Sequence, residues 1–192
     1  MSVPSRRLLA TTLAAACVLA ACKEPAPPID FTPLPAANVT IYANAGPSMQ
    51  APTEMSGAQR AVAITGGGRC NLERIDLATI GTKPVPVSKA AGVTFTGWIV
   101  DPDTKTVPAK AHLRFVDTSG SARVWMAPIA ARRPRADVRA LLGGDAAYAA
   151  SGYVADLDLA TLPDGAYRVY VVFVRGDALV ACDNGRAITL GP

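Results

Sequence analysis

The chain has 192 residues, of which 50% are hydrophobic and 18% are charged, and its formal net charge is +4. Two of the positive charges, Arg6 and Arg7, lie in a segment that we expect the cell to remove, which leaves +2. So small a charge gives no reason to expect nucleic-acid binding. The length that remains suits one domain of ordinary size rather than two.

The first 21 residues have the layout of a secretory signal peptide. Arg6 and Arg7 precede an uncharged apolar run from Leu8 to Ala21 that ends in small residues. A membrane-spanning helix needs about 20 apolar residues, so this run is short for one. We therefore predict an excised signal over residues 1–21, with a retained transmembrane anchor as the alternative.

Residues 19–22 read Leu-Ala-Ala-Cys, which resembles the lipobox of bacterial lipoproteins. The resemblance implies cleavage before Cys22, a diacylglycerol on its sulfur and a fatty acid such as palmitate on its amine. More than one acyl chain makes such an anchor durable. By analogy with that family, Lys23 in place of aspartate favours the outer membrane, with the protein facing the periplasm or the cell surface.

The four cysteines then fall into two groups. Cys17 is removed with the signal and Cys22 carries lipid, which leaves Cys70 and Cys182. Two thiols in an exported protein predict one disulfide. A metal site would need more ligands, and His112 is the only histidine, so we expect neither a metal nor a cofactor.

Residues 22–59 form the predicted tether between the lipid and the folded domain. Prolines break helices and remove backbone donors, and they stand here at positions 25, 27, 28, 33, 35, 47 and 52. This composition predicts a partly extended linker. Val39–Tyr42 is the one apolar stretch, and a small strand docked on the domain is the alternative there.

From residue 60 onward, apolar and polar residues alternate, which indicates half-buried strands. Three glycines at 66–68 predict a turn before a strand that opens at Arg69. The further predicted strands cover residues 93–100, 110–117, 122–129, 152–159, 166–175, 179–182 and 186–190. Turn sequences separate several of them, at 101–104, 118–121, 162–165 and 175–178.

The alternation also predicts which side chains face the core. The core-facing residues are Val93, Phe95 and Ile99 in one strand, Tyr153, Ala155, Leu157 and Leu159 in another, and Tyr167, Val169, Val171 and Phe173 in a third. Residues 166–175 are rich in β-branched and aromatic side chains, which is typical of a central strand.

Residues 135–142 predict one short helix instead of a strand. Val138, Leu141 and Leu142 are placed on one face, and Gly143 follows as a stop signal. The whole pattern predicts a single antiparallel immunoglobulin-like β-sandwich over residues 60–192, with this helix in a connection. The disulfide would tie the first core strand to the second-last.

Four short pieces, residues 97–101, 133–138, 151–153 and 162–167, follow one another along the domain. With them, residues 68–188 resemble a small β-sandwich module of bacterial envelope proteins, found alone or appended to membrane proteins such as glycosyltransferases. Ala136 stands where the similar modules often have proline. The resemblance implies an accessory or binding role near cell-surface glycans and assigns no catalytic residue.

Arg132, Arg133 and Arg135 cluster in a predicted loop before the helix. Loops often carry binding residues, and guanidinium groups match phosphates and carboxylates. These arginines are therefore candidates for contact with lipid A phosphates, an acidic polysaccharide or an acidic protein. The alternative is a solvated loop in which Asp137 pairs with one of them.

The aromatic residues Trp98 and Trp125, with Tyr148 and Tyr153, are candidates for a sugar-stacking platform. Packing in the core or on a sheet face is the alternative interpretation for all four. These two tryptophans join the three arginines as the candidate ligand-binding residues.

Asp101, Asp103 and His112 carry no assigned chemistry. Two carboxylates fall short of the six to eight oxygen ligands of calcium, so we interpret the aspartates as turn caps. We expect His112 to be an exposed strand residue, with a Ser-His-Asp triad as the alternative. No nucleophile-elbow glycine pattern accompanies it to support the triad.

The sequence therefore predicts a non-catalytic envelope lipoprotein, held to a membrane by its N-terminal lipid, whose sandwich binds a surface glycan or an envelope protein. Nucleic acid is not an expected partner. A hydrolase acting on glycan or cell wall, and a structural subunit of an envelope complex, are the two alternatives.

Overall fold

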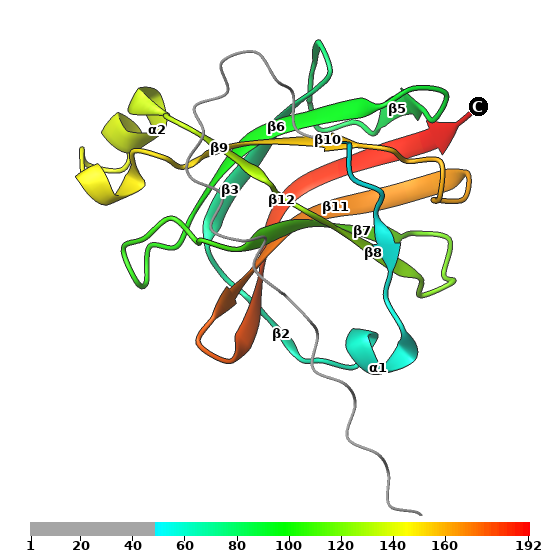
Figure 1. Ribbon diagram of the computed structural model, residues 1–192, viewed down its shortest axis with the longest axis horizontal. Coiled ribbons are helices and arrows are strands. Elements are labelled where there is room, and N and C mark those ends of the chain that lie inside the picture. The colour runs from blue at the N-terminus through cyan, green and yellow to red at the C-terminus, as the bar shows by residue number, and fades with distance from the viewer. Residues whose placement is uncertain (1–48) are drawn as a thin grey trace, which may run out of the picture.

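The computed structural model describes residues 49–192. Strands dominate this part of the chain and form two sheets, with three short helical elements between them (Figure 1). The predicted signal peptide, Cys17, Cys22 and the possible strand at Val39–Tyr42 lie outside the described residues. In the described part, no helix has the length and apolarity needed to cross a membrane.

The elements follow one another in the order β1 (Thr53–Glu54), α1 (Gly57–Arg60), β2 (Ile64–Gly66), β3 (Arg69–Ile75), β4 (Ala78–Thr79), β5 (Val85–Ser88), β6 (Val93–Val100), β7 (Ala111–Asp117), β8 (Val124–Pro128), β9 (Ala131–Arg133), α2 (Ala136–Leu141), the 3₁₀ turn η1 (Ala146–Tyr148), β10 (Gly152–Leu157), β11 (Gly165–Arg175) and β12 (Ala178–Gly191).

One sheet has seven strands in the order β1-β8-β7-β11-β12-β2, with β5 also paired to β12. The other has five strands in the order β4-β3-β6-β10-β9. The pairings are antiparallel, as predicted, except that β2 and β5 run parallel to β12. The long predicted strands thus form the centre of each sheet, and the shortest strands lie at the edges.

The main hydrophobic core lies between the two sheets and joins residues of both. All eleven residues predicted to face the core belong to it, and none is more than 3% exposed. Phe95 of one sheet meets Phe115 of the other edge to face, with ring centroids 5.7 Å apart. The period-two alternation therefore identified the buried face of these strands correctly.

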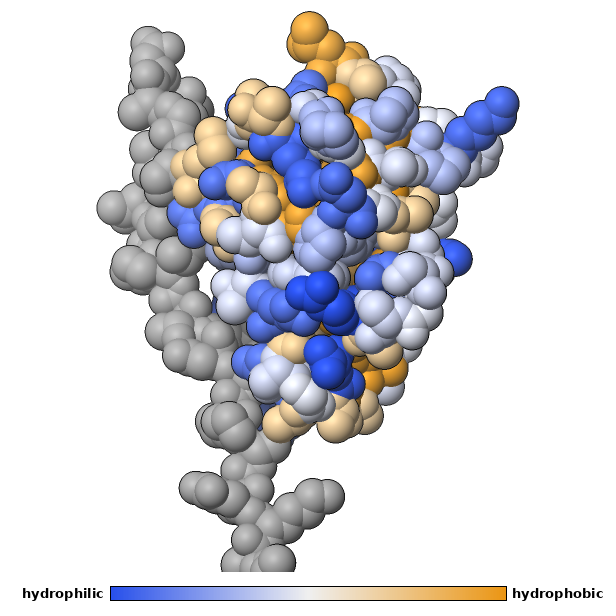
Figure 2. Space-filling model, turned by 90° about the vertical axis from the view of Figure 1, so that its right-hand side faces the viewer, coloured by the Kyte–Doolittle hydropathy of each residue, from blue (hydrophilic) through white to orange (hydrophobic). Residues whose placement is uncertain are grey.

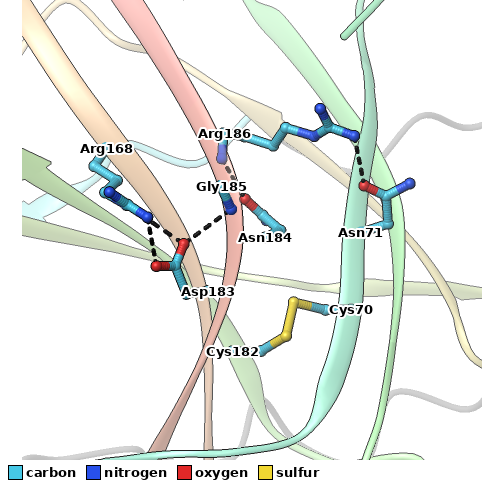
Figure 3. Close-up of a disulfide and its surroundings, with 8 residues drawn as sticks. All are labelled: Cys70, Asn71, Arg168, Cys182, Asp183, Asn184, Gly185 and Arg186. Carbon is cyan, nitrogen blue, oxygen red and sulfur yellow. Dashed lines mark hydrogen bonds and ion pairs between the residues drawn. A yellow bond between two sulfur atoms is a disulfide. The ribbon is translucent and has the colours of Figure 1, made fainter. Parts of the chain in front are cut away.

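A disulfide joins Cys70 in β3 to Cys182 in β12, with the two Cα atoms 6.1 Å apart, and confirms the predicted pairing (Figure 3). It links the two sheets. Cys182 lies in the last strand rather than the second-last, because the predicted strands 179–182 and 186–190 are one strand with a bulge at Asn184 and Gly185. Gly185 has a positive φ of 68° there, which glycine adopts at little cost.

Residues 49–60 form a strap across the edges of both sheets, although the sequence placed them in the tether. Gln50 exchanges backbone hydrogen bonds with Asp156 and Asp158 beside β10, each 2.9 Å long. Then β1 pairs with β8, and Met55, only 5% exposed, packs on the outer face of the seven-stranded sheet. The folded region therefore begins ahead of residue 60.

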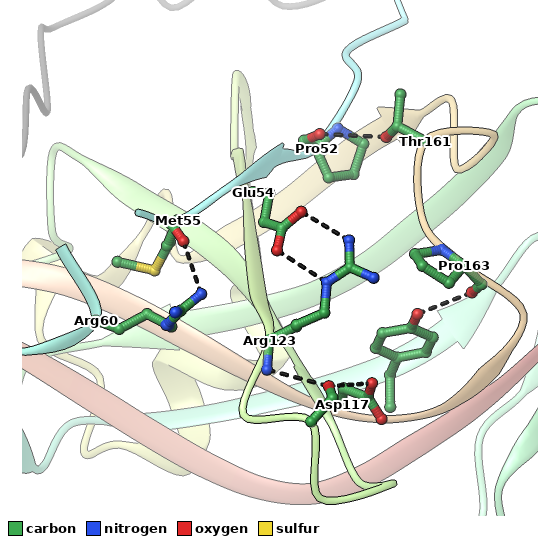
Figure 4. Close-up of polar contacts among 10 residues, drawn as sticks. Pro52, Glu54, Met55, Arg60, Asp117, Arg123, Thr161 and Pro163 are labelled. Carbon is green, nitrogen blue, oxygen red and sulfur yellow. Dashed lines mark hydrogen bonds and ion pairs between the residues drawn. The ribbon is translucent and has the colours of Figure 1, made fainter. Parts of the chain in front are cut away.

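Side-chain contacts hold the strap in place along its length (Figure 4). The guanidinium of Arg123 donates two hydrogen bonds to the carboxylate of Glu54, at 2.8 and 2.9 Å. Arg60 donates to the carbonyl of Met55, and the Thr161 hydroxyl donates to the carbonyl of Pro52. The strap is thus fixed to the seven-stranded sheet and to the loop after β10.

The predicted helix forms as α2 and packs on the outer face of the five-stranded sheet. Val138 is buried there against Trp98, Val100 and Tyr148. Leu141, placed on the same face by the sequence pattern, is 67% exposed, because the helix has only six residues and docks through Val138 and the half-buried Leu142.

Candidate functional site

The structure does not bring the three candidate arginines together. Arg132 and Arg133 lie in β9 rather than in a loop, and Arg132 pairs across from Tyr153. The guanidinium of Arg132 donates to the carbonyl of Pro108 at 2.5 Å, and burial lowers its pKa to about 10. Arg133 is exposed, so the two neighbours have different environments.

Arg135 forms ion pairs with two carboxylates. It donates to Glu73 at 2.7 Å and to Asp137 at 2.6 Å, and these hydrogen bonds raise its pKa. They also hold the pKa of the Asp137 carboxyl well below its usual range. The pairing of Asp137 with one arginine is therefore confirmed, and the bonds from Arg135 to Glu73 fasten the start of α2 to β3.

The four aromatic candidates separate into two buried groups. Trp125 and Tyr153 lie in the core between the sheets, at 2% and 1% exposure. Trp98 and Tyr148 lie beneath α2, on the outer face of the five-stranded sheet. The four side chains thus pack in the interior, as the alternative interpretation held, and do not form one sugar-stacking surface.

Asp101 and Asp103 are joined by Arg175 at the end of β11. The guanidinium of Arg175 donates to both oxygens of Asp101, at 2.5 and 2.7 Å, and contacts Asp103 at 2.7 Å. Burial raises the pKa of Asp101, but hydrogen bonds from Arg175, Thr104 and Asp103 bring it below its ordinary value. The turn-capping interpretation is confirmed for Asp101, whose side chain accepts a hydrogen bond from the Asp103 amide. Within residues 49–192, no group of three or more side chains could hold a metal ion.

His112 is not the exposed residue that the sequence predicted. It lies half-buried in β7, on the outer face of the seven-stranded sheet, opposite Val172. Burial lowers the pKa of His112 from its ordinary value of 6.5 to about 4. The imidazole is therefore neutral in the folded protein at physiological pH.

This burial predicts a loss of stability in mild acid. Between pH 6.5 and about 4 the unfolded chain protonates His112 whereas the folded chain does not, so stability falls as the pH drops through this window, by up to about 3 kcal/mol. Urea unfolding at a series of pH values would measure it. His112→Gln should lose most of this dependence, and an identical pH profile for the variant would contradict the assignment.

One group of polar side chains does converge on the outer face of the seven-stranded sheet. Arg114 in β7, Tyr170 in β11 and Asp183 in β12 are direct neighbours across three strands. Arg114 and Arg168 both lie over the Tyr170 ring, with guanidinium carbons 5.8 and 5.7 Å from its centroid. We call these four residues the arginine–tyrosine patch.

The charges of this patch are unevenly balanced. Arg168 donates to Asp183 at 2.5 Å, and this hydrogen bond raises its pKa (Figure 3). In the described part of the chain Arg114 has no ion pair, and its buried Nε atom has no hydrogen-bond partner. Burial lowers the pKa of Arg114. The patch therefore holds two guanidinium groups but one carboxylate.

This arrangement suits an anionic ligand with a ring. A guanidinium presents paired donors that fit a carboxylate or a phosphate, and an aromatic side chain offers a flat apolar surface with a polar tip. Arg168 and Asp183 keep 46% and 45% of their side chains exposed. Solvent and a ligand therefore both have access to one side of the patch.

Sequence reasoning missed these residues although the signal was present. Once Tyr167, Val169 and Val171 are placed in the core, the alternation of β11 puts Arg168 and Tyr170 together on the other face. Arg114 and Asp183 join them only through the pairing of β7 and β12 with β11, which no local pattern specifies.

Comparison with protein-family models finds none that matches the chain, and comparison with curated proteins finds no significant match.

Proposed function

We propose that this protein is a lipid-anchored lipoprotein of the bacterial envelope whose immunoglobulin-like sandwich binds an acidic glycan at the arginine–tyrosine patch. The lipobox at Cys22 and the preceding signal sequence support the anchor. The disulfide supports export, because such bonds persist in oxidising compartments. Lys23, the residue after Cys22, favours the outer membrane over the inner membrane.

The observation that carries the binding proposal is the Tyr170 ring flanked by two guanidinium groups, one of which has no acidic partner in the described part of the chain. A uronic acid or a phosphorylated sugar has the matching features. Its carboxylate or phosphate would accept hydrogen bonds from Arg114 and Arg168, and its ring would lie against Tyr170. Proximity to surface glycans is also what the resemblance to envelope sandwich modules implies.

Binding of purified protein to arrays of acidic and neutral polysaccharides tests this proposal. We expect wild type to bind acidic glycans, and Tyr170→Leu and Arg168→Gln each to weaken binding by about tenfold, which corresponds to ~1.4 kcal/mol. Leucine retains apolar packing beneath the patch but removes the ring face and the hydroxyl.

Arg133→Gln is the matched control, because it removes an exposed arginine from the other sheet. It should bind as wild type does. Binding that is equal in all four proteins would show that the patch is not the site, and the failure of wild type to bind any acidic glycan would overturn the proposed function.

A further inference from the structure

We propose that the end of the sandwich where the strap enters rests on the bilayer that holds the lipid anchor, with the tip of the β3–β4 hairpin inserted among the lipid headgroups. This inference rests on the lipid anchor of the proposed function. It concerns one end of the two sheets, whereas the arginine–tyrosine patch lies on a sheet face.

Register places Met49 and the hairpin tip at the same end. Ile75, the last residue of β3, pairs with Phe95 near the start of β6. Leu157, the last residue of β10, pairs with Val93 and bridges to Gln50 of the strap. The strap therefore enters at the end where β6 begins, which is also the end that carries the β3–β4 hairpin, with β10 and β6 between the two.

Two apolar side chains at this end are exposed, although that of Met49 also lies against Gly92. Leu77, at the hairpin tip, is 87% exposed, and Met49 is 53% exposed. Figure 2 looks onto this end and shows apolar atoms projecting at its top, where Figure 1 places the β3–β4 hairpin. An exposed leucine at the apex of a turn gains nothing from folding in water, but it gains from contact with acyl chains.

Polar groups around the tip suit a membrane interface. The guanidinium of Arg74 reaches the carbonyl of Leu77, at 3.4 Å, so a cation lies at the base of the exposed leucine. The nearby Asp76 carboxylate already accepts from the Thr94 amide, at 2.8 Å. An apolar tip above a cation matches the order of acyl chains and phosphates at a bilayer surface.

The position of the anchor determines which partner this end would meet. Residues 23–48 separate the lipidated Cys22 from Met49, and 26 residues span at most about 90 Å. A connection of at most this length keeps the domain within reach of the bilayer that holds the lipid. The membrane is therefore the apolar surface that this end encounters most often.

Site-specific labelling of the mature, lipidated chain in vesicles tests the inference. With Cys22 acylated and Cys70 bonded to Cys182, a new cysteine is the single free thiol. We expect an environment-sensitive fluorophore on Leu77→Cys to show blue-shifted emission and quenching by spin-labelled lipids. The control is Leu141→Cys, which is also exposed but lies on α2, beside Trp98 and Val100 at the other end of β6. Its fluorophore should show neither effect.

A second pair of variants tests whether the hairpin tip causes the docking. A fluorophore on Met49→Cys should report the membrane in the wild-type background and in Leu141→Asp, and should shift to the spectrum of water in Leu77→Asp. Leu77 makes few contacts, so this variant should fold as wild type does. A Leu77 label as water-exposed as the Leu141 label would overturn the inference.

The anchor itself is tested separately, by mass spectrometry of the N-terminal peptide and by release of Cys22→Ala from membranes. Absence of lipid on Cys22 would contradict the proposed anchor. Lipid on Cys22, with the Leu77 fluorophore still in water, would contradict only the docking.

Discussion

Replacing Cys70 and Cys182 with alanine is expected to lower the free energy of unfolding by about 4–5 kcal/mol. The bond closes a loop with a sequence separation of 112 residues. In the chain-entropy model, removing such a bond stabilises the unfolded chain by about this amount, because the chain gains conformational entropy. A domain of ordinary stability has about 5–15 kcal/mol in total. The loss would therefore leave the fold marginal at physiological temperature.

Urea unfolding followed by the fluorescence of Trp98 and Trp125, which are both buried, would measure this loss. Reduction of the wild-type bond should give the same decrease as the double alanine variant, and reducing agent should not affect the variant. A decrease below about 1 kcal/mol would show that the bond restricts the unfolded chain far less than the chain-entropy model predicts.

Gly97→Ala is expected to destabilise the fold by about 3 kcal/mol or more. Gly97 lies in the middle of β6, and the ring of Tyr153 from β10 covers it. A Cβ atom there would lie 2.6 Å from the Tyr153 hydroxyl and still nearer to the carbonyl oxygen of Asn71. Because the latter is backbone, β3 would have to move, and overpacking of this kind is costly.

Gly66→Ala is the matched control for that variant, because Gly66 is also a strand glycine and a Cβ atom would meet nothing within 4 Å of it. Thermal unfolding of the two variants should show a large decrease in midpoint for Gly97→Ala and little change for Gly66→Ala. Similar midpoints would mean that β3 can shift away from Gly97 at small cost.

The central strands could be predicted because their own residues specify them. In β6, β10 and β11 the apolar residues alternate over six or more positions. The sequence of each strand therefore specifies which of its faces is buried in the core. The strands β1, β2, β4 and β5 have two to four residues each. Their partners determine them, which is why the proline-containing strap was assigned to the tether.

The candidate site was harder to predict than the fold. Arg132, Arg133 and Arg135 are neighbours in sequence, but a strand sends adjacent side chains to opposite faces, and Glu73, from 62 residues away, pairs with Arg135. The residues of the arginine–tyrosine patch, by contrast, are far apart in the sequence. Arg114, Tyr170 and Asp183 become neighbours only through the order of the strands. Proximity along the chain therefore grouped Arg132 with two arginines from which the strand separates it, and it concealed the patch that strand order builds.

The strap and the disulfide together determine how the domain would respond to mechanical force. A pull on an N-terminal lipid anchor would first load the hydrogen bonds of Gln50 and then the short pairing of β1 with β8. Peeling could continue only as far as Cys70, because the covalent bond to Cys182 fixes the rest of the sheets. The 21 residues from Met49 to Arg69 would release about 70 Å of chain. The domain would thus lengthen under tension until the disulfide carries the load. Its core and the patch on β7, β11 and β12 would stay folded.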